Sequence, residues 1–112
     1  MVSSLHHLRA KGVPFVFTDR HAYLQAAQFF SDLSDLGQID WPILQARDFK
    51  RNPDDPGKLE RYQAEALVHR HLPVGGLLGM ACHGQATATS LTQLASARGL
   101  SLRAIAQPGW YF

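Results

Sequence analysis

Cysteine and long hydrophobic runs are both scarce in this sequence. Cys82 is the single cysteine, which excludes an internal disulfide framework and suits a reducing compartment. It stands in the apolar run 77–82, so we expect a small buried core residue there. No apolar run approaches the roughly 18 residues of a membrane span, and the N-terminus lacks the apolar segment of a secretory signal. The sequence therefore predicts a cytoplasmic location and no membrane partner.

Acidic residues are missing between Ala66 and Phe112. Residues 1–57 hold six Lys and Arg against seven Asp and Glu, a net charge of −1, whereas residues 58–112 hold five against two, a net charge of +3. A positive second half is compatible with a phosphate-bearing partner. Hydrophobic residues make up 46% and charged residues 18% of the 112. This composition excludes a disordered chain and predicts one globular domain over 1–112.

Helical and strand patterns alternate along the chain, which predicts a mixed α/β (α+β) fold with a small sheet and short helices. The first expected elements are a helix from Ser3 or Ser4 to Lys11, a strand at 15–17 and a helix from Thr18 or Asp19 through Phe30. The periodicity at 62–68 is ambiguous, and the following residues favour a strand that ends at Pro73. A strand at 77–82, a helix at 87–98 with Leu91, Leu94 and Ala95 on one face, a strand at 101–105 and a terminal aromatic strand or plug at 110–112 complete the expected order.

Residues 31–57 interrupt this pattern with Asp, Ser, Gly and Pro residues between isolated apolar side chains. We expect short helical turns there, pinned by Trp41 and Phe49, and a tight turn at 52–57. A long polar connection with its own hydrophobic anchors is uncommon inside a small domain and is often a functional loop.

Glu65 is the single carboxylate in the segment where the chain turns from polar to apolar. Moving a charge into apolar surroundings costs free energy unless a partner or a substrate uses that charge. Glu65 is therefore a candidate catalytic residue. The alternative is a solvent-facing residue on an edge strand.

Several short motifs carry a resemblance to a known family. They are Phe17-Thr18-Asp19-Arg20-His21-Ala22, Asp35-Leu36, Ile39-Asp40-Trp41, Phe49, Arg61-Tyr62-Gln63-Ala64-Glu65-Ala66-Leu67-Val68 and Trp110-Tyr111-Phe112. In this order and spacing the chain resembles DarT-type DNA ADP-ribosyltransferases, toxins whose partner is a macrodomain antitoxin that removes the modification. Ala66 departs from the family, which usually has a bulky aromatic residue beside the glutamate.

The resemblance covers only the back part of the family's domain. The front part, with the histidine and arginine elements that grip NAD, has no counterpart before Met1. The resemblance thus implies an ADP-ribosyltransferase-like half-domain that needs a separate N-terminal half for catalysis. With that half, NAD would be the substrate and its ADP-ribose would pass to a base of single-stranded DNA. Glu65 would stabilise the positive charge that develops on the ribose when nicotinamide leaves.

The resemblance also implies a DNA site. In the family, the region between the first motif and the glutamate is a substrate-recognition loop, here 31–61. Two groups of residues are candidates for binding DNA. They are Thr18, Asp19, Arg20 and His21 in the first motif, and Arg47, Lys50, Arg51, Lys58 and Arg61 for phosphates with Tyr62 or Trp41 for stacking on a base. The alternatives are a helix cap at 18–21 and a core anchor at Trp41.

Two further interpretations remain. His69 and His71 share one face of a strand, but three or four converging ligands are needed for zinc and no cysteine pattern supplies them, so we predict no metal. Residues 91–106 match the rhythm of a helix-turn-helix motif with Ala95, Gly99 and Ile105 at its key positions. That pattern indicates a small DNA-binding regulator, and a third possibility is a non-catalytic remnant that still binds DNA. The regulator needs a helix at 101–106, where the α+β interpretation needs a strand.

Overall fold

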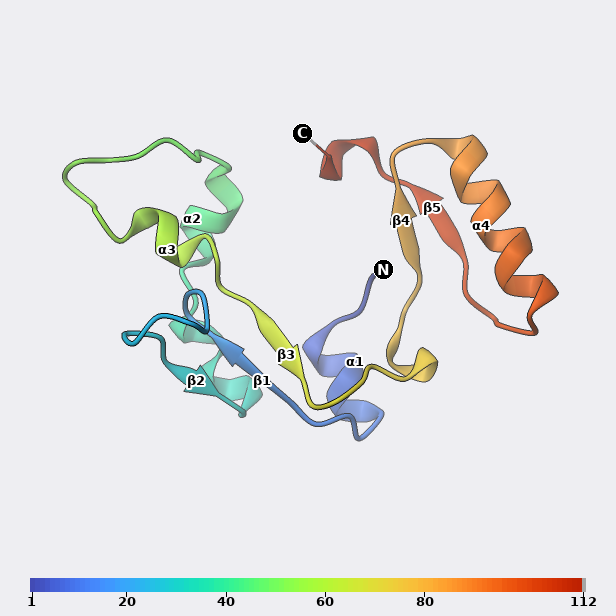
Figure 1. The fold of residues 1–112 in the computed structure, drawn as a ribbon, viewed down its shortest axis with the longest axis horizontal. Helices are drawn as coiled ribbons and strands as arrows, with labels where there is room; N and C mark the ends of the chain where they lie inside the picture. Colours follow the sequence, from blue (N-terminus) through green and yellow to red (C-terminus); the bar gives the residue numbers. More distant parts are fainter. Residues whose placement is uncertain (112) are drawn as a thin grey trace. The chain divides into compact units, whose positions relative to one another are not determined.

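The computed structural model describes residues 1–111, which divide into two units (Figure 1). One unit is the continuous segment 14–70, and the other combines 1–13 with the segment that begins at 71. Helices and strands are mixed in the chain, as the sequence predicts. The single domain over 1–112 stays a prediction.

A three-stranded antiparallel sheet forms the centre of the 14–70 unit. Strand β1 (Phe15–Thr18) lies between β2 (Phe29–Phe30) and β3 (Ala66–Val68). Phe17 of β1 pairs with Phe30 on one side and with Ala66 on the other, and the rings of Phe17 and Phe30 stack with centroids 5.5 Å apart. Phe15 and Phe17 are buried. The prediction of a strand at 15–17 is confirmed by β1. The strand forms here because its apolar side chains are buried on one face of the sheet.

The predicted helix between Thr18 and Phe30 is wrong. Residues 19–28 form turns, and Phe29–Phe30 is strand β2. The backbone N–H of Gln28 donates to Asp19 Oδ1 at 2.9 Å, which folds the segment back on itself. Phe29 and Phe30 can then pair with β1, and this pairing replaces the local hydrogen bonds of a helix.

Short helical turns occur within residues 31–57, as predicted, and they are η1 (Leu33–Gln38) and α2 (Trp41–Ala46). A further short helix, α3 (Lys58–Arg61), follows this stretch. The tight turn at 52–57 is confirmed by the hydrogen bond from the Asp55 N–H to the Asn52 carbonyl. Trp41 as a core anchor is wrong, since its side chain is exposed and its indole N–H donates to the Leu36 carbonyl. Ile39 is the buried residue of this stretch.

The other unit begins with α1 (Leu5–Ala10), which confirms the first predicted helix. The Ser4 hydroxyl accepts from the His7 N–H at the start of this helix. Gly12 follows the helix with a φ of +67°, a left-handed conformation that glycine adopts without steric cost. The short turn η2 (Val74–Gly76) lies further along the chain in the same unit.

A strand–helix–strand segment dominates this unit. Strands β4 (Met80–Cys82) and β5 (Ala104–Ala106) pair in parallel, and α4 (Gln85–Ala97) connects and covers them (Figure 1). Ala88 and Ala95 are the buried residues of α4. Leu94, which the sequence places on the core face, is exposed instead. The small alanines let the helix approach the strands, and the Ala104 N–H donates to Thr92 Oγ1 at 2.9 Å.

This segment tests two predictions, the helix-turn-helix motif at 91–106 and the burial of Cys82. Residues 104–106 form a strand and 101–103 have no regular structure, so the helix-turn-helix interpretation is wrong. Cys82 is buried, as predicted, and its thiol donates to the carbonyls of Gly84 and Ile105.

The C-terminal prediction holds only in part. Residues Pro108–Trp110 form the turn η3 rather than a strand. The Tyr111 hydroxyl donates to the Ala81 carbonyl at 3.0 Å, which holds the end of the chain to β4. Phe112 lies outside the described residues. None of the helices in residues 1–111 has the length and hydropathy required to cross a bilayer.

Candidate functional site

Glu65 stands immediately before β3, where its backbone is tied to the end of β1. The Thr18 N–H donates to the Glu65 carbonyl at 2.9 Å. The Thr18 hydroxyl accepts from the Glu65 N–H at 3.3 Å and donates back to the Glu65 carbonyl at 3.4 Å. Thr18 is fully buried, with 0% of its surface exposed. These contacts fix the backbone from which the candidate catalytic carboxylate projects.

The carboxylate of Glu65 is anchored on one oxygen and open on the other. Oε1 accepts from the backbone N–H of Ala22 at 2.7 Å, a short bond typical of a charged acceptor. Within residues 1–111, Oε2 has no hydrogen-bond donor bound to it. About a third of the side chain is exposed, 35% by area. A carboxylate held in this way keeps one oxygen available for a ligand.

His21 lies beside this carboxylate. Its Nδ1 is 3.4 Å from Glu65 Oε1 and 3.1 Å from the backbone N–H of Tyr23. A ring with an unprotonated Nδ1 accepts from Tyr23, whereas a proton on Nδ1 would point toward Glu65. The two arrangements exclude one another, so the state of His21 decides how many donors face the carboxylate.

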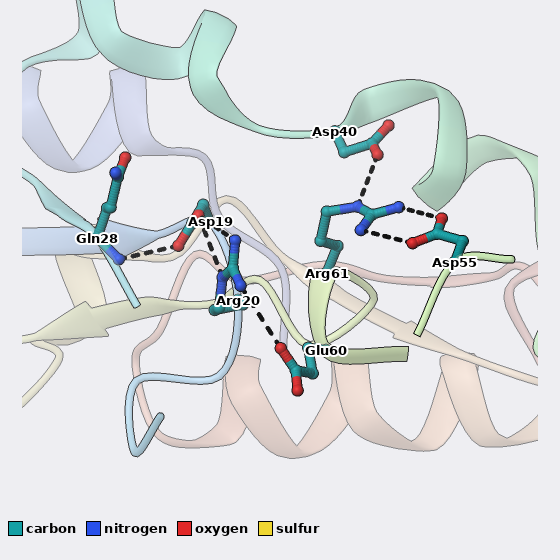
Figure 2. A network of polar contacts seen from close by, with 7 residues as sticks. All are labelled: Asp19, Arg20, Gln28, Asp40, Asp55, Glu60 and Arg61. Atoms are coloured by element: carbon teal, nitrogen blue, oxygen red, sulfur yellow. Dashed lines mark hydrogen bonds and ion pairs between the residues drawn. The ribbon is translucent and has the colours of Figure 1, made fainter. Parts of the chain in front are cut away.

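Asp19 and Arg20 lie in the same turn as His21 and Ala22, and Figure 2 shows their contacts with Gln28 and Glu60. Arg20 donates to Asp19 Oδ2 through Nε at 3.2 Å and Nη2 at 3.1 Å, and its Nη1 reaches Glu60 Oε2 at 3.5 Å. Burial acts to raise the pKa of Asp19, but hydrogen bonds from the Gln28 backbone and Arg20 outweigh it and leave that pKa below its usual value. The network therefore links the turn at 19–28 to α3.

Two of the predicted phosphate-binding residues are used in ion pairs within the loop. Arg61 binds Asp40 and Asp55 (Figure 2), and the Lys58 ammonium lies 2.7 Å from Asp48. The hydrogen bond with Asp55 raises the pKa of Arg61 above its ordinary value and lowers that of Asp55. The hydrogen bond from Lys58 lowers the pKa of Asp48. A phosphate would have to compete with these carboxylates.

Lys50 and Arg51 are different, because both are exposed and neither forms an ion pair with the described residues. Arg51 borders a surface groove of about 500 Å³ that also includes Asn52 and Leu59. Arg47 is exposed and has a left-handed backbone, with a φ of +51°, at the end of α2. Lys50 and Arg51 match the expected phosphate contacts better than Lys58 and Arg61 do.

Tyr62 is positioned by its neighbours in the loop. Its ring packs on Phe49 with centroids 4.8 Å apart, and its hydroxyl accepts from the Asp48 N–H at 2.8 Å. Trp41 has the more exposed ring of the two stacking candidates. The role of either ring in binding a base stays a prediction.

The residues that the sequence analysis missed are backbone groups and acidic partners. Ala22 contributes an N–H, and Asp40 and Asp55 hold Arg61. Asp40 had a detectable signal, since an Asp before Trp-Pro is a favourable N-cap, and it accepts from the Ile43 N–H. Nothing in the sequence pairs it with Arg61.

A metal centre was predicted to be absent. Within residues 1–111 no group of three or more His, Cys, Asp or Glu side chains has the arrangement to hold an ion. His69 and His71 do not share a strand, because β3 ends at Val68 and Arg70 has a φ of +63°.

Comparison with known proteins adds a family. All of residues 1–112 match the family model described as "ssDNA thymidine ADP-ribosyltransferase, DarT". A DNA ADP-ribosyl transferase of Escherichia coli O127:H6 is 49% identical over the whole chain, which covers 51% of that relative. Thermus sp. 2.9 DarT in complex with NAD+ aligns with a TM-score of 0.86 at 30% identity, covering 98% of this chain and 55% of that one. The same protein in complex with ADP-ribosylated ssDNA gives a TM-score of 0.85 at 31% identity, with 98% and 52% covered. The chain thus spans about half the length of the relatives it matches.

Proposed function

The chain belongs to the DarT family of ssDNA thymidine ADP-ribosyltransferases, and from this membership we propose that it contributes the catalytic-glutamate part of a DNA ADP-ribosyltransferase. NAD is the donor, and a base of single-stranded DNA, which the family description narrows to thymidine, is the acceptor. The observation that carries the proposal is Glu65, a carboxylate anchored through one oxygen and open at the other. The solved structures with NAD+ and with ADP-ribosylated ssDNA support the same reaction.

In the reaction, the bond between the ribose C1′ and the nicotinamide nitrogen breaks, and a bond from C1′ to a ring nitrogen of the base forms. Positive charge develops on the ribose ring as nicotinamide leaves with the bonding electrons. The Glu65 carboxylate stabilises that charge, and its free Oε2 can accept from a ribose hydroxyl. The base loses the proton of its ring N–H, which a carboxylate within hydrogen-bond reach can accept.

The chain's own contacts keep the carboxylate in place for this task. Thr18 holds the backbone of Glu65, and the Ala22 N–H holds Oε1. Because these contacts are formed before a ligand binds, little reorganisation is needed when charge develops. We assign Thr18 a positioning role, since its full burial leaves no surface for contact with DNA.

We propose that residues 31–61 are the DNA-recognition loop of a partial DarT-like domain. Its exposed basic residues, Lys50 and Arg51, would contact phosphates, and Trp41 or Tyr62 would stack on an unpaired base. Arg47, exposed at the end of α2, and the groove beside Arg51 belong to the same loop. Arg20 and His21 would approach the DNA from the turn that also holds Glu65.

The remaining proposals concern partners. Because relatives are about twice as long, we expect the grip on NAD to need residues beyond those of this chain, supplied by a further N-terminal segment. A macrodomain antitoxin that reverses the modification is the expected biological partner. A cytoplasmic location fits a reaction between NAD and DNA and a single, reduced cysteine.

Incubation with labelled NAD and single-stranded oligonucleotides tests the proposal. One oligonucleotide contains thymidine, a second of equal length lacks it, and a third is the duplex of the first. We expect label to be transferred only to the single-stranded oligonucleotide that contains thymidine. If the chain by itself is inactive, the same result is expected after the front half of a relative is added. Binding of the first oligonucleotide without transfer under both conditions would instead favour a non-catalytic DNA-binding remnant, and neither binding nor transfer would contradict the proposal.

A further inference from the structure

Arg61 binds two carboxylates of its own loop through three of its five N–H donors. Its Nε donates to Asp40 Oδ2 at 2.9 Å, while Nη1 and Nη2 donate to the two oxygens of Asp55 at 3.1 and 2.5 Å (Figure 2). The contact with Asp55 is a bidentate pair, in which the planar guanidinium matches the geometry of a carboxylate. Each of its three nitrogens is therefore bound to a carboxylate oxygen.

The two carboxylates come from separate parts of the loop. Asp40 begins α2, where its other oxygen accepts from the Ile43 N–H. Asp55 lies in the turn at 52–57, and its backbone carbonyl accepts from the Lys58 N–H. Arg61 itself ends α3, four residues before Glu65. One side chain thus joins the start of α2, the tip turn and the helix that leads to the candidate catalytic residue.

We propose that Arg61 is a positioning residue that holds the DNA-recognition loop in its binding shape, and not a phosphate ligand. Three of the five N–H donors of Arg61 are bound to Asp40 and Asp55, and a phosphate that approached the other two would meet these two negative charges at close range. The side chain is also only 26% exposed. The proposal rests on the proposed function, because the loop matters to DNA only if the chain binds DNA.

Substitutions of the basic residue and of its two acidic partners distinguish a positioning role from a phosphate-binding role. Arg61→Met removes the clamp, and so do Asp40→Asn and Asp55→Asn. Asparagine keeps the N-cap of α2, since it caps as well as aspartate does. The clamp predicts that all three variants weaken single-stranded DNA binding in the same direction, by about tenfold, the size expected for losing hydrogen bonds to a charged group. Arg61→Lys does not rescue binding, because one ammonium cannot span both carboxylates.

Arg51→Met is the matched control, an exposed arginine of the same loop without an internal ion pair. If Arg51 contacts one phosphate, its loss lowers the salt dependence of binding to single strands by about 0.7 in log–log slope. The clamp predicts an unchanged slope for Arg61→Met. Fluorescence anisotropy of a labelled thymidine-containing oligonucleotide at several salt concentrations measures both affinity and slope.

Hydrogen exchange of residues 31–61 without DNA provides an independent readout. Faster exchange there in Arg61→Met, Asp40→Asn and Asp55→Asn, with unchanged protection of β1 and β3, is the expected result. The proposal would be overturned by a lower salt slope for Arg61→Met together with DNA binding by the two aspartate variants that is as tight as, or tighter than, that of the wild type. If the wild-type chain binds no DNA, the proposed function fails, and the exchange data alone decide whether the clamp exists. Unchanged exchange in all three variants would then overturn it.

Discussion

Replacing Thr18 with valine removes a hydroxyl and keeps the shape of the side chain. That hydroxyl is the acceptor for the Glu65 N–H and a donor to the Glu65 carbonyl, at 3.3 and 3.4 Å. A buried donor without a partner costs roughly 1–3 kcal/mol, and because both contacts are long we expect about 1 kcal/mol. At typical urea slopes the midpoint of unfolding falls by about 0.5 M.

Thr18→Ser supplies the comparison. It keeps the hydroxyl and loses a buried methyl group, which also costs about 1 kcal/mol. The two variants are therefore equally destabilised, and only Thr18→Val loosens the backbone of Glu65. We expect ADP-ribose transfer by Thr18→Val to fall about tenfold below that of Thr18→Ser, because small displacements of a reacting group are costly. Urea denaturation and initial rates of transfer to the oligonucleotide measure the two effects. Equal transfer rates in the two variants would refute the positioning role of Thr18.

Three other predictions concern charge and backbone conformation. Asp19, Asp48 and Asp55 have lowered pKa values. Their contribution to stability is therefore present above the pKa of the unfolded state and is lost as pH falls through the pKa of the folded state. At pH values below about 4 the urea midpoint should decrease, and it should decrease less steeply in Asp55→Asn. Lys50→Ala with Arg51→Ala should weaken single-stranded DNA binding and lower the salt slope by about 1.4 if each residue contacts one phosphate, and an unchanged slope would exclude both contacts. Gly99→Ala should lower the free energy of unfolding by about 1 kcal/mol, because Gly99 has a φ of +69°. Gly75→Ala is its control and should lose no stability, because Gly75 is exposed, has no positive φ and has no atom within 4 Å of the added carbon.

The local elements of the fold could be read from the sequence where one interaction dominates. The apolar run at 15–17 became β1, and Ser4 and Gly12 bound the first helix as expected. The segment 19–30 could not be read, because its apolar residues stand at helical spacing. Its shape comes from one contact within the segment, from Gln28 to Asp19, and from one to a distant part of the chain, from Ala22 to Glu65.

The candidate site shows the same division. Glu65 could be named as a candidate because a lone carboxylate stands out in an apolar segment and because the motif around it resembles the family. The roles of the basic residues could not be found, because composition reveals a positive charge and not its partner. The hydrogen bond between Arg61 and Asp40 joins residues 21 positions apart in the sequence, and that between Lys58 and Asp48 joins residues 10 apart. Only the folded loop distinguishes these residues from the exposed Lys50 and Arg51.

The central claim is that the Glu65 carboxylate does the chemistry. Single-turnover transfer of ADP-ribose to a thymidine-containing strand, measured for Glu65→Gln and for Glu60→Gln, tests it most directly. Glu60 is a nearby carboxylate whose contact with Arg20 is long, at 3.5 Å. We predict that Glu65→Gln lowers the rate by on the order of a hundredfold or more, with DNA affinity nearly unchanged, and that Glu60→Gln has little effect. Equal rates in Glu65→Gln and the wild type would contradict the account.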